Sequence, residues 1–167
     1  MNYQIINSFI NKLDPELAHS LAIQFLKNFY IPLFPSKDDE ILKTTVLGKE
    51  FLNPIGLAAG FDKNAEVYDK MLALGFGFAE VGTITPKPQE GNLKPRVFRL
   101  MEDEAIINRL GFPNQGLAKI KSRIETKKAE GILGINIGPN KDSTSRIDDY
   151  VECFKNFHNF TMFSIAY

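Results

Sequence analysis

The feature that most constrains this chain is the alternation of short apolar runs with amphipathic segments that begins at Ile55. The apolar runs predict strands at 55–59, 78–82, 132–137 and 162–166. The segments between them carry apolar residues at helical spacing and predict helices at 65–74, 115–128 and 148–157. Strands that alternate with helices form a parallel sheet, because each helix returns the chain to the same end of the sheet. The expected fold class is therefore α/β.

The amino-terminal part of the chain is predicted to be helical. Residues 1–34 are interpreted as two helices, and Asp14 followed by Pro15 is a typical start for the second helix. That helix carries one apolar stripe, made of Leu17, Leu21, Ala22, Phe25, Leu26 and Phe29. The sequence thus predicts a helical pair with an apolar face.

A mostly polar linker, 37–43, is the expected domain boundary. It separates an amino-terminal extension, 1–36, from a larger unit, 44–167. Two β-prone runs around a glycine turn predict a hairpin within 44–52.

Three details of the larger unit are predicted less directly. The proline-rich segment 85–95 is expected to be irregular, and 96–100 could form a short extra strand. The helix 148–157 is expected to turn four residues inward: Tyr150, Cys153, Phe154 and Phe157.

Bulk composition excludes several classes of protein. Twenty basic and 20 acidic side chains leave no net charge among the 167 residues, so there is no electrostatic case for nucleic acid. A single cysteine, Cys153, cannot form an internal disulfide. No apolar run approaches the roughly 20 residues needed to span a bilayer. We expect no secretory signal and assign no residues to a metal.

Polar residues follow three successive predicted strands. Lys63 comes after the first strand, Thr83 ends the second and Asn136 ends the third, each close to glycine. The carboxyl ends of parallel strands converge on one side of a barrel or sheet. Lys and Asn offer hydrogen-bond donors and acceptors but no redox-active group, so this site suits a flat heterocycle. Any electron chemistry would come from a bound cofactor.

Simpler interpretations compete with each of these residues. A lysine after a strand is often a solvated surface lysine, and Asn136 could bond its own turn backbone. Thr83 could be an ordinary loop hydroxyl. Composition and spacing leave these alternatives open.

Seven motifs in order resemble the quinone-dependent (class 2) dihydroorotate dehydrogenases. They occupy 53–63, 75–78, 80–83, 85–92, 94–100, 107–112 and 134–138. The segment 13–19, Leu-Asp-Pro-Glu-Leu-Ala-His, also resembles the helical extension of class 2.

This resemblance implies a (β/α)8 TIM-type barrel that binds FMN. Members oxidise dihydroorotate to orotate in pyrimidine biosynthesis and pass the electrons to a membrane quinone. The amino-terminal helices would lie on the membrane surface as a peripheral anchor, on the cytoplasmic face if the protein is bacterial, and would form the quinone entrance.

The resemblance also implies roles for individual residues. FMN would contact Ala59, Gly60, Phe61, Asp62, Lys63, Thr83 and Asn136. The substrate would meet Lys63, Asn108, Arg109, Leu110, Gly111 and Phe112, in a loop before the helix at 115–128. The quinone tunnel would include His19 and Arg99.

The chain departs from the family near residue 160. The family's Ser-Ser-Pro-Asn loop, which carries the catalytic base, is absent, so no catalytic residue is assigned. We expect a barrel truncated after about four strands, without the phosphate site that such barrels build from later loops. By itself this chain is expected to be inactive.

Two other functions are considered. The chain could be a non-catalytic half-barrel, a subunit or scaffold that pairs with itself or with a second chain that completes the barrel. A flavodoxin-like nucleotide-binding domain fits less well, because no Gly-x-Gly-x-x-Gly motif opens a helix.

Overall fold

The computed structural model describes residues 10, 12–28, 39–127, 129–159 and 163–166. The helices are α2 (Pro15–Asn28), the 3-10 turn η1 (Glu40–Leu42), α3 (Tyr68–Ala73), α4 (Leu117–Thr126) and α5 (Arg146–Phe157). The strands are β1 (Thr44–Val46), β2 (Lys49–Phe51), β3 (Gly56–Leu57), β4 (Phe78–Ile84), β5 (Val97–Leu100), β6 (Ala105–Asn108), β7 (Ile132–Ile137) and β8 (Phe163–Ala166).

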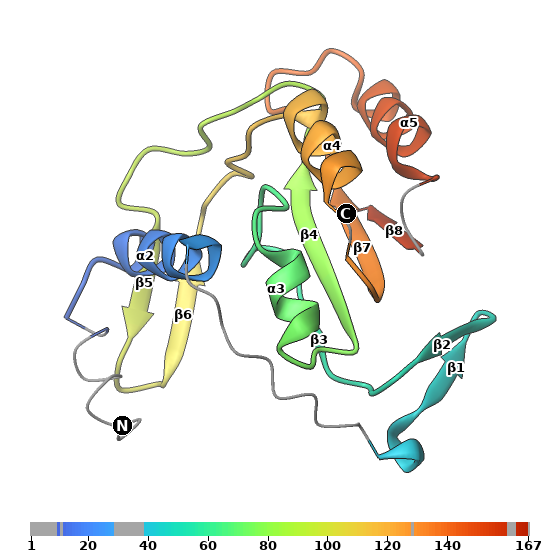
Figure 1. Ribbon diagram of the computed structural model, residues 1–167. Helices are drawn as coiled ribbons and strands as arrows, with labels where there is room; N and C mark the ends of the chain where they lie inside the picture. Colours follow the sequence, from blue (N-terminus) through green and yellow to red (C-terminus); the bar gives the residue numbers. More distant parts are fainter. Residues whose placement is uncertain (1–9, 11, 29–38, 128, 160–162, 167) are drawn as a thin grey trace.

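The centre of the fold is a four-stranded parallel sheet in the order β3-β4-β7-β8, which confirms the predicted α/β alternation. Each strand lies beside the next parallel strand along the chain, as in the wall of a barrel (Figure 1). The sheet has only these four strands in the described part of the chain, so barrel closure stays a prediction.

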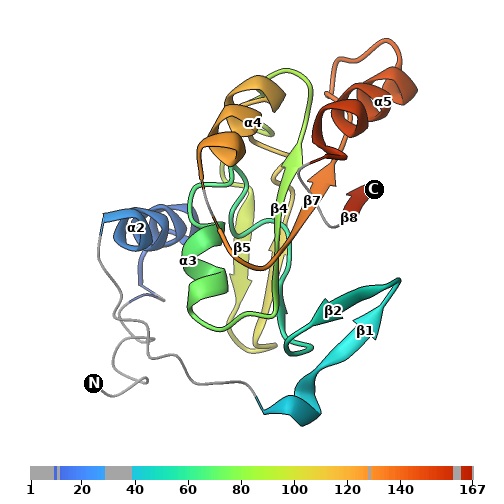
Figure 2. The same ribbon diagram turned by 45° about the vertical axis from the view of Figure 1, so that its right-hand side comes forward.

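One face of the sheet packs against α3, α4 and α5 (Figure 2). Ala79 and Val81 of β4 alternate with Glu80 and Gly82 and join the buried apolar cluster, and Ile84 joins it after a shift of register between Val81 and Ile84. From β7, the cluster takes Leu133, Ile135 and Ile137. Because side chains alternate along a strand, Glu80 and Asn136 belong to the opposite, inner face.

Two of these elements differ from their predicted bounds. The strand predicted at 55–59 is reduced to β3, and α3 begins at Tyr68 instead of residue 65. The helix begins late because Ala65 has a positive φ of 53° and interrupts any helix there. The carboxylate of Asp62 holds the turn, accepting the amide N–H groups of Glu66 and Val67 at 2.7 Å each.

The predicted hairpin is confirmed as the antiparallel pair β1–β2. The ring of Phe51 meets that of Phe78 edge-on, with 5.5 Å between centroids, so the hairpin contacts the amino-terminal end of β4.

The doubtful strand at 96–100 exists as β5, and its partner β6 was not predicted. The placement of Asn108 in a loop was wrong, because this residue ends β6 and pairs with Val97. A two-stranded hairpin with one exposed strand lacks a clear hydrophobic alternation, which explains the omission.

Helix α5 corrects one predicted core residue. Cys153 and Phe157 are fully buried and Tyr150 is partly buried, as expected. Phe154 is 53% exposed and stacks on His158, so its inward assignment was wrong. The sheet next to α5 covers only one side of the helix.

The second amino-terminal helix is confirmed as α2, while the predicted first helix lies outside the described residues. The side chain of Asp14 accepts the amide N–H groups of Glu16 and Leu17 at 3.0 and 2.9 Å, a typical N-cap. Helix α2 contacts β5 and lies across the β5–β6 hairpin (Figure 1). No helix in the described ranges is long and apolar enough to span a membrane.

Candidate functional site

A cavity of about 730 Å³ lies between α2, the loop after β3 and the β5–β6 hairpin. Its walls include six of the residues predicted to bind ligands: His19, Phe61, Asp62, Lys63, Asn108 and Leu110. These residues come from three separate segments of the chain. The cavity therefore gathers residues from all three predicted ligand groups at one place.

Lys63 is the central cation of this cavity. Its ammonium donates to the carbonyl oxygen of Gly60 at 2.6 Å, which folds the side chain over its own loop. Burial lowers the pKa of Lys63, and the carboxylate of Glu16 opposes that shift only in part. A half-buried cation with one neutral partner retains donors for an anionic ligand.

The loop that carries Lys63 is seated on the end of β4. Gly60 donates its N–H to the carbonyl of Gly82 at 3.0 Å, and Gly82 donates to the carbonyl of Asp62 at 3.2 Å. Gly60 has a φ of 104°, and no atom lies within 4 Å of the place where a Cβ would stand. The main chain at Gly60 is thus open to close approach by a flat group.

Thr83 and Asn136 form a second cluster on the inner face of the sheet. The Thr83 hydroxyl donates to Asn136 Oδ1 at 2.6 Å, and Asn136 Nδ2 donates to Glu80 Oε1 at 3.0 Å. Asn136 is fully buried and Thr83 is half-buried. Sequence reasoning found Thr83 and Asn136 but missed Glu80, whose position within a strand gave no sign of a site.

The predicted substrate segment, 108–112, begins at the last residue of β6 and is held by the loop after β4. Asn92 donates its side-chain amide to the carbonyl of Arg109 at 2.8 Å. Gln89 donates to the carbonyls of Gly111 and Phe112 at 3.1 and 3.3 Å. The side chain of Asn108 remains exposed at the cavity, so it can reach a ligand.

His19 connects α2 to the Lys63 loop. Its Nε2 lies 2.6 Å from the carbonyl oxygen of Phe61, and the two rings meet edge-on at 5.5 Å. A carbonyl can only accept, so Nε2 carries the proton and Nδ1 is free to accept. Burial, and then the charge of Lys63, lowers the pKa of His19. The neutral imidazole is therefore favoured.

Arg99, the other predicted quinone residue, does not line the cavity. Its guanidinium donates to the carbonyl oxygen of Leu13, just before α2, at 2.6 Å. Arg99 thus helps to hold the start of α2 on β5.

Two residues that hold α2 were missed by sequence reasoning. Arg96 Nε donates to both oxygens of Glu16 at 3.1 Å, and Nη2 donates to Oε1 at 2.8 Å. Arg96 Nη1 also donates to the carbonyls of Glu90 and Asn92 at 2.6 and 2.9 Å. These bonds to Arg96 lower the pKa of Glu16. The arginine was visible in the motif at 94–100, but its partner lies 80 residues earlier.

Side-chain amides that the sequence reasoning also missed connect the loops at the carboxyl end of the sheet by hydrogen bonds. Asn140 donates to Thr85 Oγ1, to the carbonyl of Lys87 and to Gln89 Oε1 at 3.1, 2.8 and 3.0 Å. Buried Asn114 donates to Thr85 Oγ1 at 2.9 Å.

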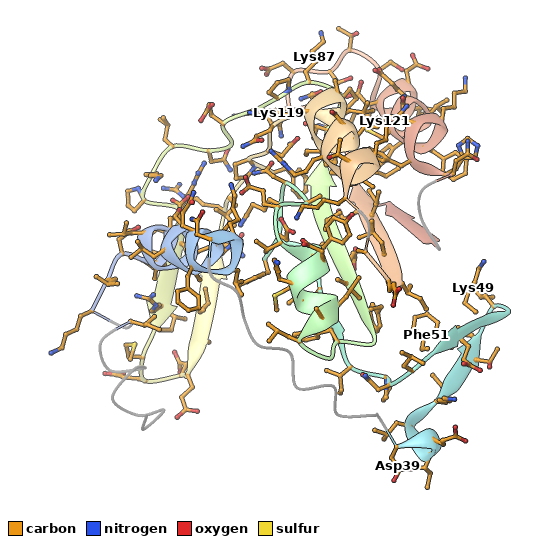
Figure 3. The ribbon with its side chains drawn as sticks, viewed as in Figure 1. Asp39, Lys49, Phe51, Lys87, Lys119 and Lys121 are labelled. Atoms are coloured by element: carbon orange, nitrogen blue, oxygen red, sulfur yellow. The ribbon has the colours of Figure 1, made fainter. Side chains whose placement is uncertain are left out.

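Lys87 lies near the loop between β7 and α5, whereas Lys49 and Phe51 lie on the β1–β2 hairpin at the opposite end of the molecule (Figure 3).

The cavity does not collect every predicted residue. The remaining ones lie beside it or on the sheet: Ala59, Gly60, Thr83, Arg99, Arg109, Gly111, Phe112 and Asn136. The bond between Gly60 and Gly82 joins the cavity loop to the Thr83 cluster. The two groups therefore form one continuous region at the carboxyl end of β4.

Known proteins match this chain over most of its length. The family model described as "Dihydroorotate dehydrogenase" matches residues 41–165. A "Dihydroorotate dehydrogenase (quinone)" of Rhizobium rhizogenes is 50% identical over 154 residues, which are 92% of this chain and 42% of the relative. One of Allorhizobium ampelinum is 56% identical over 146 residues, 87% of this chain and 40% of the relative.

A solved structure gives the same result. The crystal structure of the Eimeria tenella enzyme, "DHODH in complex with ferulenol", superposes with a TM-score of 0.85 at 44% identity. It covers 92% of this chain and 43% of that chain. This chain thus spans about two-fifths of the length of its curated relatives.

Proposed function

Because the chain belongs to the dihydroorotate dehydrogenase family, we propose that it supplies part of a quinone-dependent dihydroorotate dehydrogenase. The reaction oxidises dihydroorotate to orotate in pyrimidine biosynthesis, with FMN as cofactor and a membrane quinone as final acceptor. One observation carries the proposal: His19, Lys63 and Asn108 line one cavity of about 730 Å³ beside α2.

The residues present fit a flavin. The open main chain at Gly60 would accept a flat ring, with Ala59 and Phe61 on either side of it in the chain and Lys63 bonded to its carbonyl. Thr83 and Asn136 provide polar groups next to it, through the Gly60–Gly82 bond. When bound, FMN accepts the electron pair of the substrate and passes it to the quinone. Asp62 acts indirectly, because its carboxylate is engaged with two backbone amides of its loop.

The same cavity fits an anionic pyrimidine. Lys63 would pair with the carboxylate of the substrate, a charge-assisted bond that is stronger than a neutral one. Asn108 would bond the ring amide. The segment from Arg109 to Phe112, with Leu110 and Gly111, would shape the wall, because the loop after β4 holds its carbonyls in place.

Helix α2 suits a peripheral attachment to the membrane surface. Leu17, Leu21 and Phe25 are about half exposed and follow one another at intervals of four residues. His19, on the same helix, lines the cavity, and so does Leu17 at the start of this stripe, so the exposed stripe and the cavity meet on α2. A quinone would thus enter where the stripe reaches the cavity, near His19, while Arg99 holds the start of α2 beside it.

We further propose that turnover needs residues beyond these 167. The curated relatives are more than twice as long, and the described residues contain no assigned catalytic base. A non-catalytic subunit or scaffold is the second candidate function. The sheet order supports it, since β3 and β8 are each paired on one side only within the described residues. A second chain could pair with these edges.

The experiment is flavin retention. The purified chain is mixed with FMN, desalted and read by visible absorption, alone and with the complementary portion of a relative. The site is supported if the chain retains flavin and if less flavin stays bound in Lys63→Met but not in Lys49→Met. A colourless protein in both mixtures would contradict it. Flavin that is retained only with the complementary portion favours the subunit.

A further inference from the structure

Glu80 is a buried carboxylate on the inner face of the sheet that the proposed function does not use. It is 7% exposed in the middle of β4 and pairs across the strands with Gly134 of β7. Its neighbours Ala79 and Val81 face the helices, so the carboxylate points away from the apolar core. A buried carboxylate needs a specific partner.

That partner is the amide of Asn136. Asn136 Nδ2 donates to Glu80 Oε1 at 3.0 Å, and Asn136 Oδ1 accepts the Thr83 hydroxyl at 2.6 Å. The three side chains form a chain of bonds from the middle of β4 to its carboxyl end. Asn136 is fully buried, so solvent does not compete for its groups.

We propose that Glu80 is a positioning residue that sets the hydrogen-bond direction of Thr83. A carboxylate accepts hydrogen bonds and donates none, so the amide of Asn136 must turn its NH2 group toward Glu80. The amide carbonyl then faces Thr83 and takes the hydroxyl proton. The Thr83 oxygen keeps only lone pairs for any other partner.

This arrangement selects ligands by the group that they present. A ring N–H that meets Thr83 finds an acceptor, whereas a ring carbonyl finds another oxygen and no proton. The bond chain belongs to the protein alone, while its use in selecting a heterocycle rests on the proposed function. Glu80 thus acts through Asn136 and does not touch the ligand.

The test uses nuclear magnetic resonance of the full chain labelled with ¹⁵N, without any ligand. The readout is the side-chain amide pair of Asn136 and its exchange with solvent. Glu80→Gln keeps the shape but can donate as well as accept, so the amide can reverse. Glu125→Gln removes an exposed charge on α4 and is the control.

In Glu80→Gln we expect the Asn136 side-chain resonances to shift and the amide to exchange about tenfold faster, since a neutral amide oxygen is a weaker acceptor than a carboxylate and no longer fixes the direction of the bond. The exchange rate should be unchanged in Glu125→Gln and in Thr83→Val, because Thr83→Val removes the bond to Asn136 Oδ1 and leaves the bond from Nδ2 to Glu80. Unchanged resonances in Glu80→Gln, or equal loss of protection in Thr83→Val, would overturn the proposal. Should Glu80→Gln not fold, Thr83→Val decides alone: persistence of protection supports Glu80, and loss contradicts it. A chain that binds no FMN contradicts the proposed function but not this result.

Discussion

Arg96, just before β5, donates three hydrogen bonds of 2.8 to 3.1 Å to the carboxylate of Glu16 on α2. Lys94 reaches the same carboxylate at 3.6 Å, but its side chain is 66% exposed, against 10% for Arg96. The two cations offer a matched comparison, because buried and exposed ion pairs differ in strength.

Arg96→Gln is expected to lower the free energy of unfolding by about 3 kcal/mol, because it leaves the part-buried carboxylate of Glu16 with only the exposed Lys94 and removes the donor to two carbonyls. Lys94→Gln should cost less than about 1 kcal/mol, as is usual for an exposed pair. Urea unfolding, with proteolysis of α2 as a second readout, checks both values. Equal losses would mean that the Arg96 bonds do not dock the helix.

His19 predicts a pH dependence for α2. Its folded-state pKa is lowered below the ordinary 6.5, so the unfolded chain binds the proton more readily. The contribution of neutral His19 is complete above pH 6.5 and declines as the pH falls below that value toward the folded pKa. The N–H donated to Phe61 persists, but a second proton would place charge in a buried site beside Lys63.

His19→Gln should therefore flatten the stability profile as the pH falls below 6.5, while His158→Gln, at an exposed site, should retain the slope. Thermal melts at several pH values and fixed ionic strength measure this slope. If both variants show the same slope, groups other than His19 cause the pH dependence.

Two glycines should respond differently to alanine. At Gly82 a Cβ would stand 2.3 Å from the carbonyl oxygen of Asn136, whereas at Gly60 it would meet nothing within 4 Å. Both have positive φ, which costs a Cβ-bearing residue about 1–2 kcal/mol. The destabilisation by Gly82→Ala should exceed that cost, because the added methyl group would also disturb the sheet. Gly60→Ala should fold, yet lose FMN because the methyl group occupies the open position. Flavin retention that is normal in a folded Gly60→Ala would place the ring elsewhere.

The exposed stripe of α2 should bind lipid. Phe25 and Phe154 are each 53% exposed, on α2 and α5 respectively. Phe25→Gln is expected to weaken partition onto phosphatidylglycerol-containing vesicles about tenfold, the effect of losing roughly 1.4 kcal/mol of apolar burial. Phe154→Gln should leave co-sedimentation unchanged. An equal reduction in both would indicate non-specific adsorption.

The sequence determined the secondary structure where the periodicity is strong. The strand at 132–137 and the helix in the α4 region could be predicted because their apolar positions face one shared core. It also determined the family through residues at strand ends. The late start of α3 could not be predicted from the sequence, since it depends on the positive φ of Ala65 and on the hydrogen bonds that the carboxylate of Asp62 accepts.

Only the tertiary structure decided which polar groups meet. Glu16 and Arg96 lie 80 positions apart, and Glu80 and Asn136 lie 56 apart. No local pattern records such a distance, because sequence periodicity reports which side of one element is buried. Pairing across elements depends on how the sheet and α2 bring separate segments together. The ligand-binding residues thus stay a prediction from the sequence, of which six line one cavity, while the residues that hold them in place appeared only in the folded chain.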